Sequence, residues 1–178
     1  MKTAIKKWNR MILKSSKALS KGSASWLKPA AFVLGIGIVT WLVSHFFIQL
    51  MLIQGSSMEP TYHNHQFVWI NKQERIPDYG DVIAFRCEAV RGVLVKRVVA
   101  KPGDTVSIQD GTLYVNGTPS VVLGMEQKLT NVGDRTGDIV LPDGEYYVIG
   151  DNLEVSKDSR YQQIGNVSED AILGFVFP

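Results

Sequence analysis

The sequence predicts a mainly β protein, an antiparallel barrel or folded sheet, with one transmembrane helix near its N-terminus. Three observations support this prediction. A long uncharged apolar run follows a basic N-terminal arm. Beyond residue 53 the chain changes to short apolar runs separated by turn residues, which is typical of β structure. After the apolar run, no segment of comparable length has the period of a helix.

Charge is distributed unevenly along the 178 residues. Residues 1–28 contain eight Lys or Arg and no acidic residue, whereas the rest of the chain contains 11 basic and 17 acidic residues. A basic arm of this kind either binds nucleic acid or flanks a membrane segment. The uncharged run that follows favours the membrane, so we expect lipid and not nucleic acid as its partner.

Residues 29–58 contain no Asp, Glu, Lys or Arg, and Ala30–Ile53 is mostly apolar. As a helix, the 24 residues of Ala30–Ile53 would be about 36 Å long, enough to cross a hydrocarbon core of about 30 Å. A cleavable secretory signal usually has a shorter apolar part, of about 7–15 residues. We therefore expect a cytoplasmic arm at 1–28, a transmembrane helix at 29–53 and an extracytoplasmic domain at 54–178, oriented by the positive charges.

Seven short strands are predicted in the domain, with Asp110-Gly111 as a tight hairpin between two of them. Seven strands of this length can close over one core as a barrel or a folded sheet. Residues 123–138 give no clear pattern. The predicted strands are Gln66–Asn71, Asp81–Arg86, Val93–Val99, Thr105–Ile108, Thr112–Val115, Tyr146–Ile149 and Leu173–Phe177.

Neither a disulfide nor a metal site is expected. Cys87 is the single cysteine, so no bond can form within the chain. His63 and His65 lie close together in sequence, but no other metal ligands accompany them, and we expect two exposed loop histidines. No organic cofactor is expected either.

Ser57 lies in a Gly- and Ser-rich segment directly after the apolar run. Such a segment also suits a simple hinge, and a serine becomes a nucleophile only with a base within hydrogen-bond reach. The usual base is His, but His45 lies in the run, and His63 and His65 follow Ser57 too closely for a triad to be inferred. A Ser-Lys pair is a known variant of the same chemistry.

Lys96 lies in the middle of an apolar β run. Because side chains alternate along a strand, Leu94, Lys96 and Val98 point to one face, and Arg97 points to the other. Desolvation on an apolar face lowers the pKa of an amine and makes a neutral base available. The lysine could equally extend along its aliphatic stem to water.

A third polar cluster, residues 150–160, follows the strand Tyr146–Ile149. It contains Gly150-Asp151-Asn152 and Ser156, Asp158, Ser159 and Arg160. Alone it is typical of a turn region held by short polar side chains.

Together these segments resemble the type I signal peptidases, peptidase family S26. The resemblance is carried by Gly55-Ser56-Ser57-Met58-x-Pro60-Thr61, Tyr79-Gly80-Asp81-Val82-Ile83, Lys96-Arg97-Val98-Val99 with Pro102-Gly103-Asp104, and Gly150-Asp151-Asn152 with Ser156-x-Asp158-Ser159-Arg160. The four boxes occur in that family's order and cover residues 54–104 and 146–177. One span and a small domain resemble its Gram-positive branch.

The resemblance implies a membrane-bound serine endopeptidase that removes signal peptides from secretory precursors. Ser57 would be the nucleophile and Lys96 the general base. The matching family positions give supporting roles: Ser156 orients the amine, Asp158 and Arg160 form an ion pair, and Met58 and Pro60 shape the serine loop.

Two positions depart from the family pattern. Gly55 stands where some members have a serine that helps to bind the oxyanion, and Leu153 replaces the arginine that usually follows Gly-Asp-Asn.

We expect the precursor to add as an extended strand beside Asp81–Phe85 and Leu94–Lys96. The alternatives are a Ser-Lys peptidase with a dedicated substrate such as a pilin, a self-cleaving repressor, which the span argues against, and a membrane-tethered binding module.

Overall fold

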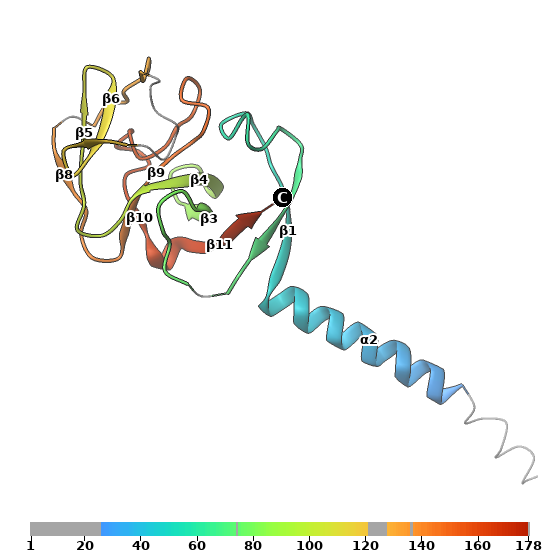
Figure 1. Cartoon of the computed structure of the whole chain (residues 1–178). Coiled ribbons are helices and arrows are strands. Elements are labelled where there is room, and N and C mark those ends of the chain that lie inside the picture. The colour runs from blue at the N-terminus through green and yellow to red at the C-terminus, as the bar shows by residue number, and fades with distance from the viewer. Residues whose placement is uncertain (1–25, 74, 121–127, 136, 178) are drawn as a thin grey trace, which may run out of the picture. The chain divides into compact units, whose positions relative to one another are not determined.

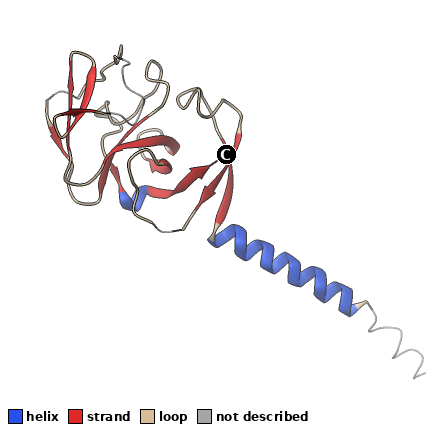
Figure 2. Cartoon of the chain, viewed as in Figure 1, coloured by secondary structure: helices blue, strands red, loops and turns tan. Residues whose placement is uncertain are grey.

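The computed structural model describes residues 26–73, 75–120, 128–135 and 137–177 (Figure 1). The chain divides into two compact units at His45–Phe46. Helix α2 (Leu27–Phe46) belongs almost entirely to the first unit, and all strands belong to the second (Figure 2). The predicted arm at 1–28 lies mostly outside the described residues.

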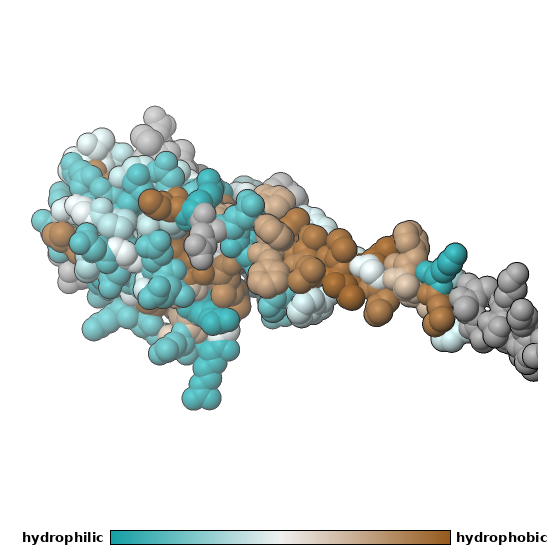
Figure 3. All heavy atoms as spheres, turned by 90° about the horizontal axis from the view of Figure 1, so that it is seen from below, coloured by the Kyte–Doolittle hydropathy of each residue, from teal (hydrophilic) through white to brown (hydrophobic). Residues whose placement is uncertain are grey.

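Helix α2 has 20 residues and buries none of its side chains. Pro29 lies in its first turn, where the missing N–H costs no helical hydrogen bond. By length and composition α2 could cross a membrane, and apolar side chains cover the helix surface that faces the viewer in Figure 3. An isolated helix with apolar side chains all round is unfavourable in water, so α2 needs an apolar environment.

The helix ends earlier than the predicted 29–53 segment. Residues Ile48–Leu52 form strand β1, which pairs antiparallel with β2 (Phe67–Asn71). The predicted C-terminal end of the helix is therefore wrong. Its physical reason is that an uninterrupted apolar run fits a strand as well as a helix, and here the free edge of β2 takes up the backbone of residues 48–52.

All seven predicted strands are present, and no strand end differs from its prediction by more than one residue. Besides β2, they are β3 (Val82–Cys87), β4 (Gly92–Ala100), β5 (Thr105–Gln109), β6 (Thr112–Val115), β9 (Glu145–Ile149) and β11 (Ile172–Phe177). Four strands were not predicted: β1 and the two-residue strands β7 (Thr118–Pro119), β8 (Ile139–Val140) and β10 (Val167–Ser168). A short 3₁₀ turn, η1 (Glu169–Ala171), precedes β11.

The strands form two antiparallel sheets. The larger sheet has seven strands in the order β1-β2-β11-β3-β4-β9-β10, and the smaller has four in the order β7-β6-β5-β8. Within the described ranges neither sheet closes on itself, because each order begins and ends with a different strand. The mainly β prediction is confirmed, but its closed-barrel form is wrong. Short end strands such as β10 and β7 offer little backbone for closure.

The core connects the larger sheet to the loop after β1. Met58 and Tyr62 of this loop are buried against Val68 and Ile70 of β2 and Val95 of β4. This apolar contact fixes the segment on either side of Ser57 to the sheet. Burying two such side chains is worth several kcal/mol before entropy is counted, roughly 2 kcal/mol each.

Candidate active site

Ser57 lies in the loop between β1 and β2, residues 54–66, which we call the serine loop. The two ends of the loop are joined by backbone hydrogen bonds between Ile53 and Gln66, 2.9 Å, and from His65 to Ile53, 2.9 Å. Inside it, the Gly55 N–H donates to Asn64 Oδ1 at 2.9 Å. Gly55 has a φ of +93°, a conformation that glycine adopts without strain. The departure at position 55 therefore suits the backbone of this loop.

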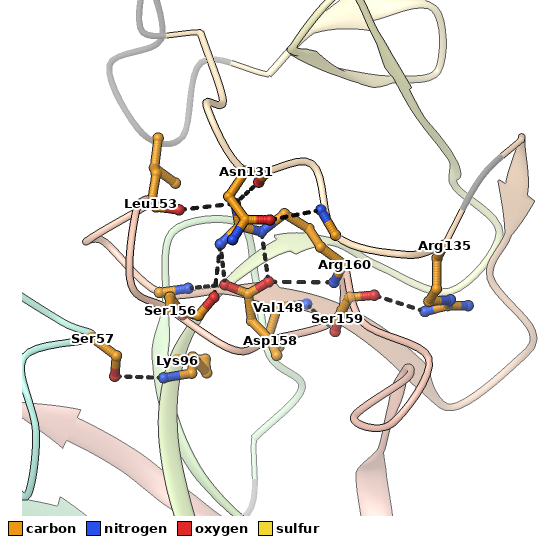
Figure 4. A network of polar contacts seen from close by, with 12 residues as sticks. Ser57, Lys96, Asn131, Arg135, Val148, Leu153, Ser156, Asp158, Ser159 and Arg160 are labelled. Carbon is orange, nitrogen blue, oxygen red and sulfur yellow. Dashed lines mark hydrogen bonds and ion pairs between the residues drawn. The ribbon is translucent and has the colours of Figure 1, made fainter.

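Lys96 of β4 reaches Ser57 across the site. Its Nζ donates a hydrogen bond to Ser57 Oγ with a length of 2.6 Å (Figure 4). The lysine is 2% exposed, so it does not extend to water as the alternative interpretation required. Leu94 and Val98 lie on the same face and pack into one cluster, as the alternation along the strand predicts.

Burial governs the ionisation of this amine. Desolvation lowers the pKa of Lys96 from 10.5 to about 8, although the carboxylates of Asp158 and Asp151 act in the opposite direction. The guanidinium of Arg160 adds to the lowering. An amine with a pKa of about 8 is partly neutral at physiological pH and can accept a proton.

Arg97, next to Lys96 on β4, ties three segments together on the opposite face of the strand. Its guanidinium donates to both carboxylate oxygens of Asp151, with Nε–Oδ1 at 2.7 Å, and to the Gly80 carbonyl at 2.7 Å. Thr61 of the serine loop donates to the same Asp151 carboxylate. These three residues belong to the quoted boxes, yet their sequence gives no sign that they meet.

The loop after β9, residues 150–160, is held by a buried ion pair. Arg160 and Asp158 are both 0% exposed and form two hydrogen bonds, Nε–Oδ1 at 2.8 Å and Nη2–Oδ2 at 2.9 Å (Figure 4). Arg160 also donates to the carbonyls of Leu153 and Ser156, both at 3.1 Å. Leu153 thus contributes its backbone carbonyl to the pair, while its side chain is buried in an apolar cluster.

Gly150 and Ser156 bring this loop against the serine loop. The Asn152 N–H donates to the Ser57 carbonyl at 3.1 Å. A Cβ on Gly150 would overlap that carbonyl and the Ser156 hydroxyl, so only glycine allows this approach. The Ser156 Oγ is fully buried and has no hydrogen-bond partner within the part of the chain that the structure describes.

A groove of about 330 Å³ opens beside the serine and the lysine. One wall comes from β1 and the start of the serine loop, including Met51 and Ile53, and the other from residues 93–96 of β4. Within the described residues, β1 is an end strand, and β9 pairs with β4 only from Arg97 onward. Both walls therefore present backbone edges that no strand occupies.

The prediction that a precursor pairs beside Asp81–Phe85 is wrong. Strand β3 pairs with β11 on one edge and with β4 on the other, so it lies inside the sheet and has no free backbone edge. Leu94–Lys96, the second predicted segment, does line the groove. Periodicity in the sequence identified a strand at both places but gave no information on which one lay next to an open edge.

The predicted loop histidines, His63 and His65, are exposed. Among the described residues, Ser57 makes hydrogen bonds with Lys96 and Asn152 and with neither histidine. Among the described residues, no three His, Cys, Asp or Glu side chains are grouped to hold a metal ion. Met58 is buried, and the Glu59–Pro60 peptide bond in the same loop is cis.

A buried amine on a serine hydroxyl beside an open groove is the arrangement of a Ser-Lys hydrolase. The family model "Signal peptidase, peptidase S26" matches residues 23–177, and the chain belongs to this family.

Two sequence relatives agree with the family match. The chain is 34% identical to "Signal peptidase I T" of Bacillus subtilis strain 168, over 92% of this chain and 90% of the relative. It is 31% identical to "Signal peptidase I" of Bacillus amyloliquefaciens, over 88% and 87%. A solved signal peptidase I from Enterococcus faecalis V583 is 28% identical, with a TM-score of 0.46, and aligns over 59% of this chain and 100% of that one.

Proposed function

We propose that this signal peptidase cleaves secretory precursors with Ser57 as the nucleophile and Lys96 as the general base. The observation that carries the proposal is the 2.6 Å contact between Lys96 Nζ and Ser57 Oγ at a buried lysine. The neutral amine accepts the hydroxyl proton while Ser57 Oγ attacks the carbonyl carbon of the last signal-peptide residue. The amine then returns the proton to the departing amino group of the mature protein, and water hydrolyses the acyl-enzyme by the same route.

The supporting residues act on the position and charge of the amine. We assign Ser156 to orient Lys96, because its buried hydroxyl makes no hydrogen bond among the described residues and is available to the amine. Asp158 and Arg160 fix the loop that carries Ser156. Met58 anchors the serine loop through its burial, and Pro60 shapes the same loop. Backbone N–H groups would stabilise the oxyanion.

The groove supports binding of the precursor as an extended strand. Its walls offer free backbone edges on β1 and on residues 93–96 of β4. A strand added there forms main-chain hydrogen bonds that do not depend on sequence, while alternate side chains enter the groove. This suits an enzyme that accepts many precursors, and Met51, Ile53 and Leu94 offer apolar contacts to the side chains before the cleaved bond.

Substitution of each member of the dyad tests the chemistry. Ser57→Ala and Lys96→Ala should each reduce precursor cleavage by detergent-solubilised full-length enzyme to background. The expected loss is about 10⁶-fold, because the two groups act together in one chemical step. Lys96→Arg should also be inactive, because guanidinium stays protonated. Ser107→Ala, on β5 of the smaller sheet, and Lys101→Ala, whose amine pairs with Asp78, are matched controls expected to keep activity. Cleavage by folded Ser57→Ala at the parent rate would refute the mechanism.

We further propose that α2 crosses the membrane with the N-terminus in the cytoplasm and the β domain outside. The eight basic residues of 1–28 and the exposed apolar surface of α2 support this orientation. Strands β1 and β2 add an exposed apolar face on which Leu50 pairs with Trp69 and Leu52 with Phe67. Such a face suits contact with lipid at the membrane surface.

Thiol labelling tests the orientation. In a Cys87→Ser background, a membrane-impermeant reagent applied to intact cells should label Asp143→Cys in the exposed turn before β9 but not Lys14→Cys in the arm. Labelling of Lys14→Cys alone would reverse the proposed topology.

A further inference from the structure

Residues 131–135, which we call the strap, lie against the backbone of Arg160. The Asp134 and Arg135 N–H groups both donate to the Arg160 carbonyl at 3.1 Å. In return, Arg160 Nη1 donates to the Asn131 carbonyl at 2.5 Å (Figure 4). The strap therefore binds Arg160 at both its backbone and its guanidinium. None of the strap residues belongs to the four boxes.

Two strap side chains hold the residues on either side of Arg160. Arg135 Nη1 donates to the Ser159 carbonyl at 3.0 Å and to Asn166 Oδ1 at 2.9 Å. Asp134 Oδ1 accepts a hydrogen bond of 2.6 Å from the Gln162 N–H. The buried turn after Asp158 is thus fixed on one side by the ion pair and on the other by the strap.

The close fit depends on Gly133. Its φ is +79°, and a Cβ added there would overlap the Arg160 carbonyl oxygen and lie 2.7 Å from the Arg160 Cβ. Real Cβ contacts of that length do not occur, so any side chain at this position pushes the strap and Arg160 apart. Gly137, only four residues later, has a similar φ of +86° but nothing within 4 Å of an added Cβ.

Arg160 connects the strap to the dyad through short steps. It pairs with Asp158, whose Oδ2 accepts the Gly150 N–H at 3.0 Å, and it donates to the Ser156 carbonyl. Gly150 in turn lies against both the Ser57 carbonyl and the Ser156 side chain. Arg160, Asp158, Ser156 and Gly150 are buried, and the last contact reaches the half-buried Ser57. Closely packed buried groups transmit displacement with little relaxation.

From this geometry we infer that the strap is a positioning element of the active site, which holds Arg160 against Asp158 and thereby sets the environment of the Lys96 amine. The inference rests on the proposed roles of Ser57 and Lys96. Asn131, Gly133 and Arg135 are positioning residues and touch no reacting atom.

Displacing the strap has a defined electrostatic consequence. The charges that act on Lys96 are the carboxylates of Asp158 and Asp151 and the guanidinium of Arg160. Arg97 continues to neutralise Asp151. If Arg160 moves away from Asp158, the carboxylate attracts the ammonium more strongly and water gains access to the site. Both changes favour protonated Lys96, so the pKa of the amine should rise.

The test compares Gly133→Ala with Gly137→Ala in the full-length enzyme in detergent micelles, because both substitutions place an alanine in a left-handed conformation. Gly133→Ala should lower kcat/KM for a precursor at pH 7 by about 100-fold, as small misplacements at a distance do. Its pH profile should move to higher pH by at least about half a unit. Gly137→Ala should stay within roughly twofold of the parent.

A second readout is independent of cleavage. The Cε signal of Lys96 in ¹³C-lysine-labelled enzyme, identified by its absence in Lys96→Met, should titrate at higher pH in Gly133→Ala than in Gly137→Ala. Equal titration midpoints in the two folded variants would overturn the inference. If Gly133→Ala does not fold, Arg135→Gln replaces it. We expect a smaller upward shift of the Lys96 titration midpoint in that variant, and an unchanged midpoint would refute the inference. If the parent enzyme cleaves no precursor, the proposed function is refuted. The Lys96 titration in the two glycine variants would still test the role of the strap.

Discussion

The pH dependence of cleavage follows directly from the burial of Lys96. With a pKa of about 8, the free enzyme has about one tenth of its amine neutral at pH 7, against roughly 0.03% for a lysine at its ordinary value. Burial therefore increases the population of the reactive form by about 300-fold, which corresponds to about 3 kcal/mol. This gain is made before any substrate binds.

The expected profile has a slope and a plateau. Below pH 8, kcat/KM should rise about tenfold per pH unit, because only the neutral amine can accept the Ser57 proton. Above pH 9 it should level off, since the amine is then almost fully neutral. The measurement is the initial rate of precursor cleavage at low substrate from pH 5.5 to 10, at constant ionic strength, with circular dichroism to verify folding at each pH.

Two results would refute this reasoning. A flat profile from pH 6 to 9 would mean that no group with a pKa near 8 limits the reaction. A break near pH 6.5, the ordinary value for histidine, would point to an imidazole base. His63→Asn and His65→Asn would then identify which of the two exposed rings titrates, and loss of the break in either variant would assign the base to that histidine.

Two further predictions concern the stability lost by burying Lys96 and the close packing at Gly150. Because the pKa of Lys96 is lower in the folded than in the unfolded state, the lysine reduces stability below pH 8, and the reduction fades as pH rises from 8 to 10.5. Lys96→Met should therefore raise the free energy of unfolding at pH 7 by about 2–3 kcal/mol while abolishing cleavage, and a variant equally or less stable in denaturant titrations would contradict this. Gly150→Ala should lower kcat by about 100-fold, because its Cβ would overlap the Ser57 carbonyl and the Ser156 hydroxyl. Normal kcat in this variant would show that the serine loop moves aside without consequence.

The sequence predicted the strands because their pattern is local. Side chains point alternately to the two faces of any strand, so Lys96 of β4 was placed on an apolar face from its neighbours Leu94 and Val98 alone. Its burial agrees with that placement. The sheet order depends instead on pairings between distant segments, such as β11 with β2 and β3. These pairings decided that Leu94–Lys96 borders the groove and that Asp81–Phe85 does not.

The C-terminal end of α2 could not be predicted from the sequence for a different reason. Residues 48–52 are as apolar as the helix before them, and only the partner strand β2 distinguishes the two conformations. The alternation that marks a half-buried strand is absent, because both faces of β1 carry apolar side chains and most of them are exposed. Four of the five residues of β1 are apolar, so the sequence shows no polar face that would reveal the period of a strand.

Sequence motifs identify side chains, whereas much of this site is held by backbone groups. The serine loop receives the Asn152 N–H on the Ser57 carbonyl, and Arg160 is bound through the carbonyls of Asn131, Leu153 and Ser156. Any residue type supplies a carbonyl, so these contacts leave no signature in the sequence. Leu153 shows this directly: its side chain departs from the family pattern, yet its carbonyl still accepts a hydrogen bond from Arg160. Substitutions in such segments therefore affect the site through backbone shape, and glycines with positive φ are where that effect should be largest.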